Sequence, residues 1–229
     1  MSGDDADAMV EWRHSRHLVD YAEAVAEMDL RAAAIRDGTA DERVWLLEHP
    51  PLYTAGTSAR PEELIDPRFP VHRTGRGGRY TYHGPGQRIG YVQLDLDRRG
   101  RDVRRYVRGL EDWLIDTLAD IGITARAIEG RVGIWVDTHS GEAKIGAIGV
   151  RVRRWVTMHG FAMNVSPNLA DFSGIIPCGL SAYPVTSLAA LGNPAGMADI
   201  DRALRKNFAA FVRRLGDCSE GLESLIHCD

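Results

Sequence analysis

The spacing of hydrophobic residues along the chain predicts three amphipathic helices. Between His17 and Asp37, apolar side chains recur every three or four residues, and Gly38 follows as a typical end signal. The same period runs over 103–121, ending at Gly122, and over 200–215. We therefore expect helices over these three stretches.

Shorter apolar runs predict strands. They cover 43–49, 90–96, 133–137, 143–153 and 156–165, and the polar residues 138–141 are typical of a hairpin turn. Stretches 61–70 and 172–186 are expected to be loops. Because the strands cluster instead of alternating with helices, the pattern favours an α+β fold with helices packed on a mixed or antiparallel sheet.

The length and composition of the chain indicate a single folded domain. The chain has 229 residues, 44% hydrophobic and 26% charged, which are ordinary values for a globular protein with a sizeable core. We expect residues 16–216 to form a single catalytic domain. The acidic residues 1–15 are expected to be disordered, and 217–229 to form a tail.

Charge and cysteine usage exclude several classes of partner. The net charge is −4, so no basic field favours nucleic acid or an anionic membrane. No apolar stretch approaches the ~20 residues of a membrane span, and the N-terminus lacks the apolar core of a signal peptide. The cysteines, Cys178, Cys218 and Cys228, are odd in number and unclustered, which indicates reduced thiols and no zinc site. We therefore expect a cytoplasmic protein without a metal.

Cys178 is the first candidate for chemistry, because it lies between Pro177 and Gly179. Proline fixes the backbone before the thiol, and glycine after it allows a substrate to approach closely. A thiol on such a turn suits a nucleophile. An isolated cysteine is also commonly a small buried hydrophobic residue, and the local sequence leaves both interpretations open.

Lys144 lies near the start of an otherwise apolar strand. If it is half-buried there, its ammonium loses a proton more readily and can serve in proton transfer. An ordinary lysine at a strand end, with its ammonium in water, is the better explanation from spacing alone.

The segment 75–86 is rich in glycine yet also carries arginine, tyrosine and histidine. It matches neither common glycine-rich phosphate-binding pattern, so we expect it to line a pocket, although turn structure explains the glycines nearly as well. His83 and His159 each lie beside a glycine. Either could act as an acid or base, or only tie a loop down, and the sequence does not rank them.

Five segments, in order, resemble the lipoyl(octanoyl)transferase family. Together they cover about 48–187, well over half of the chain, and one of them is an unusual run of twelve residues. They are EHPPLYTAG (48–56), RGGRYTYHGPGQ (76–87), KIGAIG (144–149), HGFAMN (159–164) and PCG (177–179).

The resemblance implies the fold of the biotin/lipoate protein ligases, with a mixed sheet that floors an acyl tunnel. It also implies an acyltransferase that moves an octanoyl group from octanoyl-acyl carrier protein to a lysine of lipoyl domains. Such acceptors are the lipoyl domains of 2-oxoacid dehydrogenase complexes and the glycine cleavage H protein. No cofactor is implied, because the acyl group arrives already activated as a thioester.

The resemblance also implies roles for individual residues. In that family the cysteine of the PCG motif forms the acyl thioester, here Cys178, and the lysine that heads the KI motif is its acid/base partner, here Lys144. His159 is an auxiliary candidate. The substrate-binding positions carry over to Arg76, Gly77, Gly78, Arg79, Tyr80, Thr81, Tyr82, His83, Ala147, Ile148, Gly149, Gly160, Phe161 and Ala162.

The sequence argues against three alternative functions. An ATP-dependent lipoate or biotin ligase shares the fold, but a nucleophilic cysteine is superfluous in it. A catalytically inactive acyl-binding protein would be marked by loss of Cys178 or Lys144, and both are present. A papain-like hydrolase is disfavoured, because the chain lacks the cysteine signature of that class.

Overall fold

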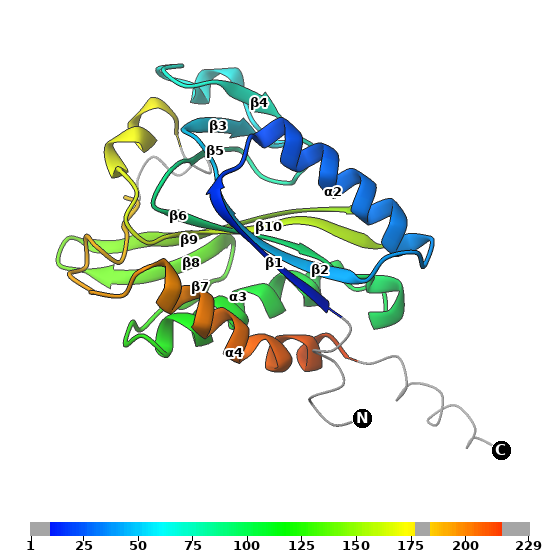
Figure 1. Ribbon diagram of the computed structural model, residues 1–229. Coiled ribbons are helices and arrows are strands. Elements are labelled where there is room, and N and C mark those ends of the chain that lie inside the picture. Colours follow the sequence, from blue (N-terminus) through cyan, green and yellow to red (C-terminus); the bar gives the residue numbers. More distant parts are fainter. Residues whose placement is uncertain (1–9, 177–183, 217–229) are drawn as a thin grey trace.

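The computed structural model describes residues 10–176 and 184–216. Its centre is a seven-stranded sheet in the order β1-β2-β6-β10-β9-β8-β7 (Figure 1). Neighbouring strands run antiparallel, except that β1 and β2 are parallel. The strands are β1 (Val10–Leu18), β2 (Glu42–Glu48), β6 (Gln87–Gln93), β7 (Arg126–Ile128), β8 (Arg131–Thr138), β9 (Gly141–Arg153) and β10 (Val156–Asn164).

A second, smaller sheet lies above the large one in the view of Figure 1. It has the order β4-β3-β5, with β3 parallel to β4 and antiparallel to β5. Its strands are β3 (Leu52–Ala55), β4 (Val71–Arg73) and β5 (Tyr80–His83). Three short 3₁₀ helices lie in the connections: η1 (Pro61–Glu63), η2 (Leu96–Arg99) and η3 (Leu169–Gly174).

Helices cover both faces of the large sheet. Helices α3 (Val103–Ala119) and α4 (Met197–Leu215) pack side by side on one face, where Trp113 stacks on Phe211 with ring centroids 4.9 Å apart. Helix α2 (Tyr21–Arg36) packs on the other face through Ala24, Met28, Ala32 and Ile35. The mixed α+β fold expected from the sequence is confirmed.

Burial on both faces explains why the central strands carry apolar residues on both of their faces. In β2, residues 42–47 are all buried, and every residue of β6 and β10 is buried. The polar residues among them hold specific partners: Gln93 donates to the carbonyl of Met28, and Thr157 donates to that of Val92. The sheet is therefore the rigid floor on which any site must be built.

The N-terminal region differs from the expectation of disorder over 1–15, because residues 10–15 belong to β1. Few apolar residues mark this edge strand, and tertiary contacts hold it: Trp12 packs edge-on against Phe208 at 5.0 Å. The first helix also begins later than expected, at Tyr21, because the carboxylate of Asp20 accepts hydrogen bonds from the N–H groups of Ala22 and Glu23. The predicted tail, 217–229, lies outside the described residues.

Two expected loops contain short helices. Residues 61–63 form η1 within the stretch 61–70, and η3 overlaps the start of 172–186. The hairpin turn at 138–141 joins β8 to β9 as predicted. Among the described residues, no helix has both the length and the apolar character needed to cross a membrane.

Candidate active site

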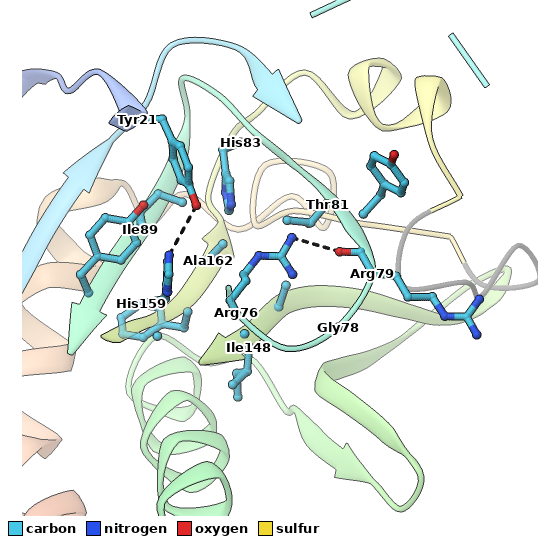
Figure 2. Close-up of a pocket in the computed structure, with 16 residues that line it drawn as sticks. Tyr21, Arg76, Gly78, Arg79, Thr81, His83, Ile89, Ile148, His159 and Ala162 are labelled. Atoms are coloured by element: carbon cyan, nitrogen blue, oxygen red, sulfur yellow. Dashed lines mark hydrogen bonds between the residues drawn. The ribbon is translucent and has the colours of Figure 1, made fainter. Parts of the chain in front are cut away.

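A pocket lies where the glycine-rich segment 75–86 crosses strands β6, β9 and β10 (Figure 2). With two exceptions, the substrate-binding residues inferred from the sequence line it, although that role stays a prediction. They are Arg76, Gly78, Arg79, Tyr80, Thr81, His83, Ala147, Ile148, Gly149, Gly160, Phe161 and Ala162, together with His159.

The two exceptions, Gly77 and Tyr82, hold the surrounding structure. Tyr82 donates a hydrogen bond of 2.9 Å to the carboxylate of Asp171 and packs against Phe172, within the core of the small sheet. The N–H of Gly77 donates to the carbonyl of Val150 at 3.0 Å, which ties the segment to β9.

Three further lining residues were missed from the sequence: Tyr21, Ile89 and Tyr91. Tyr21 is the first residue of α2, and the other two lie in β6. Their positions fit the ordinary apolar pattern of a helix and a strand. No local signal distinguishes a residue that faces the core from one that faces a pocket next to it.

The guanidinium of Arg76 is buried and holds the glycine-rich segment in place. It donates to the carbonyl of Thr54 at 2.9 Å, to its hydroxyl at 2.6 Å, and to the carbonyls of Gly77 and Arg79. Gly56 makes room for it, because a Cβ there would lie 2.8 Å from Nη1 of Arg76 and 2.3 Å from the carbonyl oxygen of Gly78. Arg76 therefore shapes the pocket wall as well as placing positive charge in it.

Three histidines around the pocket are buried and neutral. Burial is the largest cause in each case, and it lowers the pKa of His49 to about 4 and those of His83 and His159 to about 3. The positive charge of Arg76 acts in the same direction on the last two. A neutral imidazole can accept a hydrogen bond at its unprotonated nitrogen, but with so low a pKa it is a weak general base near pH 7.

A polar chain fixes the tautomer of His83. It ends at the carbonyl of Thr186, which can only accept, so the side-chain nitrogen of Asn164 donates to it at 2.9 Å. The oxygen of Asn164 then accepts from Gln87 at 2.8 Å, and the oxygen of Gln87 accepts from Nδ1 of His83 at 2.7 Å. His83 therefore carries its proton on Nδ1, which leaves Nε2 as an acceptor.

His159 combines two unusual features. It is not a glycine, yet its φ of +59° lies in the left-handed region, inside strand β10. Its Nδ1 is buried and has no hydrogen-bond partner among the described residues, while Nε2 lies 3.4 Å from the hydroxyl of Tyr21 (Figure 2). Backbone strain and an unsatisfied polar atom together are typical of functional sites.

Lys144 is buried, with 6% of its surface exposed, so the buried alternative raised by its position in the sequence is confirmed. Its Nζ donates to the carbonyl of Val132 at 2.7 Å and lies 5.5 Å from the centre of the Trp135 ring. It lines a small cavity beside the pocket, and Thr81 and Ala147 line both.

A β-bulge places Lys144 on this side of the sheet. Between β8 and β9 the register shifts from Ile134↔Gly146 to Trp135↔Lys144, so Ile145 is an extra residue. With strict alternation, Lys144 and Ala147 would point to opposite faces. The extra residue brings both to the face of the pocket, while Ile145 remains in the core beneath α3 and α4.

Cys178, the predicted nucleophile, lies outside the described residues, as do its neighbours in 177–183. The chain on either side is anchored near the site. The N–H of Ile176 donates to the carbonyl of Glu63, and the carbonyl of Pro184 accepts from the N–H of Lys144 at 2.9 Å. Within 10–176 and 184–216, no three His, Cys, Asp or Glu side chains gather in a way that could hold a metal ion.

Solved structures of lipoate ligases share this fold. A lipoate-protein ligase A bound with ATP matches 89% of this chain and 86% of its own, with a TM-score of 0.64 and 18% identity. A bipartite lipoate protein ligase of Thermoplasma acidophilum also has a TM-score of 0.64 at 18% identity, over 89% and 84% of the two chains. At such low identity these matches establish the fold alone, and they confirm the expected likeness to the biotin/lipoate ligases.

Sequence comparison is far more specific. Residues 20–209 match the family model of the lipoyl protein ligase A/B catalytic domain. An octanoyltransferase of Sphingopyxis alaskensis is 65% identical over 206 residues, which cover 90% of this chain and 95% of that protein. An octanoyltransferase of Zymomonas mobilis is 56% identical over 207 residues, 90% and 96% of the two chains. The chain therefore belongs to the lipoyl protein ligase A/B catalytic-domain family and is an acyltransferase of its octanoyltransferase group.

Proposed function

We propose that this enzyme transfers an octanoyl group from octanoyl-acyl carrier protein to a lysine of lipoyl domains, through a thioester on Cys178. The acceptors would be the lipoyl domains of 2-oxoacid dehydrogenase complexes and the glycine cleavage H protein. Relatives named octanoyltransferases, 56–65% identical to this chain, support the acyl group. The donor, the intermediate and the acceptors follow from the family resemblance and from the chemistry of the site.

The observation that carries the proposal is the burial of Lys144 next to the pocket. The chain has 28 lysine and arginine residues, of which only Lys144 and Lys206 are lysines. An arginine is permanently charged, whereas a lysine can release and take up a proton. A chain that uses arginine almost everywhere else thus carries a lysine where proton transfer would be needed.

The position of Cys178 in the sequence is compatible with this role. It follows Ile176 by two residues and precedes Pro184 by six. Pro184 and Thr186 both hydrogen-bond the backbone of Lys144, and Ile176 bonds that of Glu63. Glu63 in turn forms an ion pair with Arg79 of the pocket wall. The segment that carries the nucleophile is therefore attached at both ends to the surroundings of the pocket.

The proposed reaction has two halves. In the first, Lys144 takes the proton of the Cys178 thiol, the sulfur attacks the carbonyl of the donor thioester, and Lys144 passes the proton to the carrier thiol as it leaves. In the second, the lysine of the lipoyl domain gives a proton to Lys144 and attacks the acyl-enzyme, and Cys178 leaves as a thiolate. The first half exchanges one thioester for another, so it is nearly isoenergetic and needs no further energy source.

Lys144 could act by stabilising the Cys178 thiolate or by transferring protons, and the gain expected from the first can be estimated. Lowering a thiol pKa from ~8.5 by about two units raises its ionised fraction at pH ~7.5 from about 10% to about 90%. Thiolate nucleophilicity then falls by nearly the same factor, since its Brønsted slope in thiol exchange is ~0.4–0.5. Proton transfer in both halves is therefore the larger contribution of Lys144.

The test is intact-protein mass spectrometry after the enzyme is mixed with octanoyl-acyl carrier protein, without ATP or magnesium. We expect one octanoyl adduct, removable by hydroxylamine and mapped to the peptide of Cys178. Cys178→Ser should show no hydroxylamine-sensitive adduct. An adduct on Cys218 or Cys228, or none in a single turnover, would refute the mechanism. Product formed only from free octanoate and ATP would favour a ligase instead.

A further inference from the structure

Gly133 of β8 lies directly against the side chain of Lys144. Its φ is +123°, and a Cβ built on it would lie 2.3 Å from Cε and 2.8 Å from Nζ of Lys144. Real Cβ atoms do not approach other atoms so closely, so the end of the Lys144 side chain fills the space that any other residue at 133 would need. The carbonyl oxygen of Gly146 lies 2.7 Å from the same point.

The residue before Gly133 and a residue of α3 complete the arrangement. The carbonyl of Val132 accepts the Nζ hydrogen bond of 2.7 Å. The carboxylate of Glu111 in α3 lies near enough to the N–H of Gly133 and to Lys144 for both to act on it electrostatically. Burial raises the pKa of Glu111, while Gly133 and Lys144 both oppose the rise. The Glu111 carboxylate is thus a charged neighbour of both Gly133 and Lys144.

We propose that Gly133, with the Glu111 carboxylate nearby, is a positioning residue that sets where the Lys144 amine lies. Gly133 leaves the space for Cε and Nζ, and the peptide before it presents the carbonyl of Val132 that directs Nζ. The inference rests on the proposed role of Lys144 as the acid/base group. It adds that two residues outside the recognised motifs hold that amine in its reacting position.

The chain offers a matched control for Gly133→Ala. Gly141 lies on the same hairpin with a φ of +110°, and a Cβ there would meet no atom within 4 Å. Gly141→Ala therefore introduces similar backbone strain without touching Lys144. We expect Gly133→Ala to lower kcat for octanoyl transfer by roughly 10- to 100-fold, since a shift of about 1 Å can cost 10²-fold. The KM for the acyl donor should be unchanged, and Gly141→Ala should resemble the parent enzyme.

A second measurement reports on Lys144 without using activity. The enzyme is labelled with a trace of acetic anhydride, and mass spectrometry gives the ratio of label on Lys144 to label on Lys206, the other lysine. Lys206 is 69% exposed and pairs with Asp120, far along the sequence from the bulge, so it serves as an internal standard. We expect the ratio to rise several-fold in Gly133→Ala and to stay constant in Gly141→Ala.

Glu111→Ala tests the same idea without adding an atom beside Lys144, and Asp112→Ala is its control on the same helix. For Glu111→Ala we expect a rise in the label ratio and a fall in kcat, both smaller than in Gly133→Ala. For Asp112→Ala we expect neither. If Gly133→Ala does not fold, equal label ratios and rates in the Glu111 and Asp112 variants would overturn the inference.

A further variant, Lys144→Ala, separates failure of this inference from failure of the proposed function. If it transfers octanoate normally, the proposed function fails. If it is inactive while Gly133→Ala behaves like Gly141→Ala, only the positioning role fails.

Discussion

Lys144 would have two tasks in the proposed cycle, and they can be separated. If it only stabilised the Cys178 thiolate, high pH would restore most of the rate lost in Lys144→Ala. In deacylation the cysteine is the leaving group and needs no activation. We therefore expect preformed octanoyl-enzyme carrying Lys144→Ala to pass its acyl group to a lipoyl domain ~10²–10⁴ times more slowly, even at pH ~9. Single-turnover transfer to a purified lipoyl domain measures this.

Lys206→Ala is the control, because it removes the other lysine, which lies on the surface in an ion pair with Asp120. It should transfer at the parent rate. Deacylation at a near-normal rate by the Lys144→Ala acyl-enzyme would show that another group is the base. His83 and His159, the two alternatives left open by the sequence, have pKa values lowered to about 3 by burial, which makes them poor replacements.

Single residues show what a sequence can and cannot reveal about the site. The motif positions led to most of the pocket wall, because each motif lies in one short segment. Whether Lys144 was buried could not be predicted, since its burial depends on the register shift at Ile145 and on Gly133 of the neighbouring strand. Tyr21 and Tyr91 were missed because they lie in α2 and β6, outside the motifs. Only the tertiary fold brings them to the pocket.

At the scale of elements, the two central glycines of the glycine-rich segment differ in their surroundings. Gly78 lines the pocket at a φ of +87°, and a Cβ on it would lie 3.6 Å from Nη1 of Arg76. Gly77 does not line it, and a Cβ there would contact only the carbonyl of Val150 at 3.7 Å. Both glycines were inferred to bind substrate, and of the two only Gly78 lines the pocket.

We therefore expect Gly78→Val to raise the KM for the octanoyl donor strongly, whereas Gly77→Ala leaves it nearly unchanged. Steady-state kinetics with octanoyl-acyl carrier protein would measure both. Gly130→Ala controls for backbone strain, because Gly130 has a φ of +77° and open space around it. A folded Gly78→Val enzyme with a normal KM would remove this segment from the acyl site.

Elements with a long, regular period were predicted well, and short or irregular ones were not. The helices and the buried strands of the large sheet carry enough apolar residues to define their period. Strand β1 has mostly polar side chains, and β3, β4 and β5 are three or four residues long. Such strands form because a neighbouring strand supplies hydrogen bonds, which no local pattern of hydrophobicity records.

At the scale of the whole molecule, the buried histidines make stability depend on pH. The pKa values of His49, His83 and His159 are lowered by burial to about 4, 3 and 3, whereas an unfolded chain has histidine values near ~6.5. Below pH ~6.5 the unfolded chain therefore binds protons that the folded protein does not. The free energy of unfolding is largest above that pH, and it falls as the pH drops towards ~3–4.

Each of these histidines should lower the free energy of unfolding by about 2 kcal/mol between pH ~7 and pH ~5. Urea unfolding across this range measures the slope, and ordinary carboxylates change little in it. In His83→Gln, the free energy of unfolding should depend less steeply on pH, by up to one proton, because one of the three histidines is removed. A parent enzyme equally stable at both pH values would show that the histidines are protonated in the folded state.

Thr81 and Ala147 form a boundary between the cavity of Lys144 and the main pocket, and both cavities share them. In the proposed reaction, the acyl carbonyl must lie at this boundary, since the proton is exchanged on one side of it and the alkyl chain lies on the other. The opposite end of the pocket carries the hydroxyl of Tyr21 and the imidazole of His159, 3.4 Å apart (Figure 2). The distance between this boundary and the Tyr21–His159 end of the pocket would then set the preferred acyl length. Substitutions at the boundary would affect acyl chains of every length alike, and those at the Tyr21–His159 end would change which length fits.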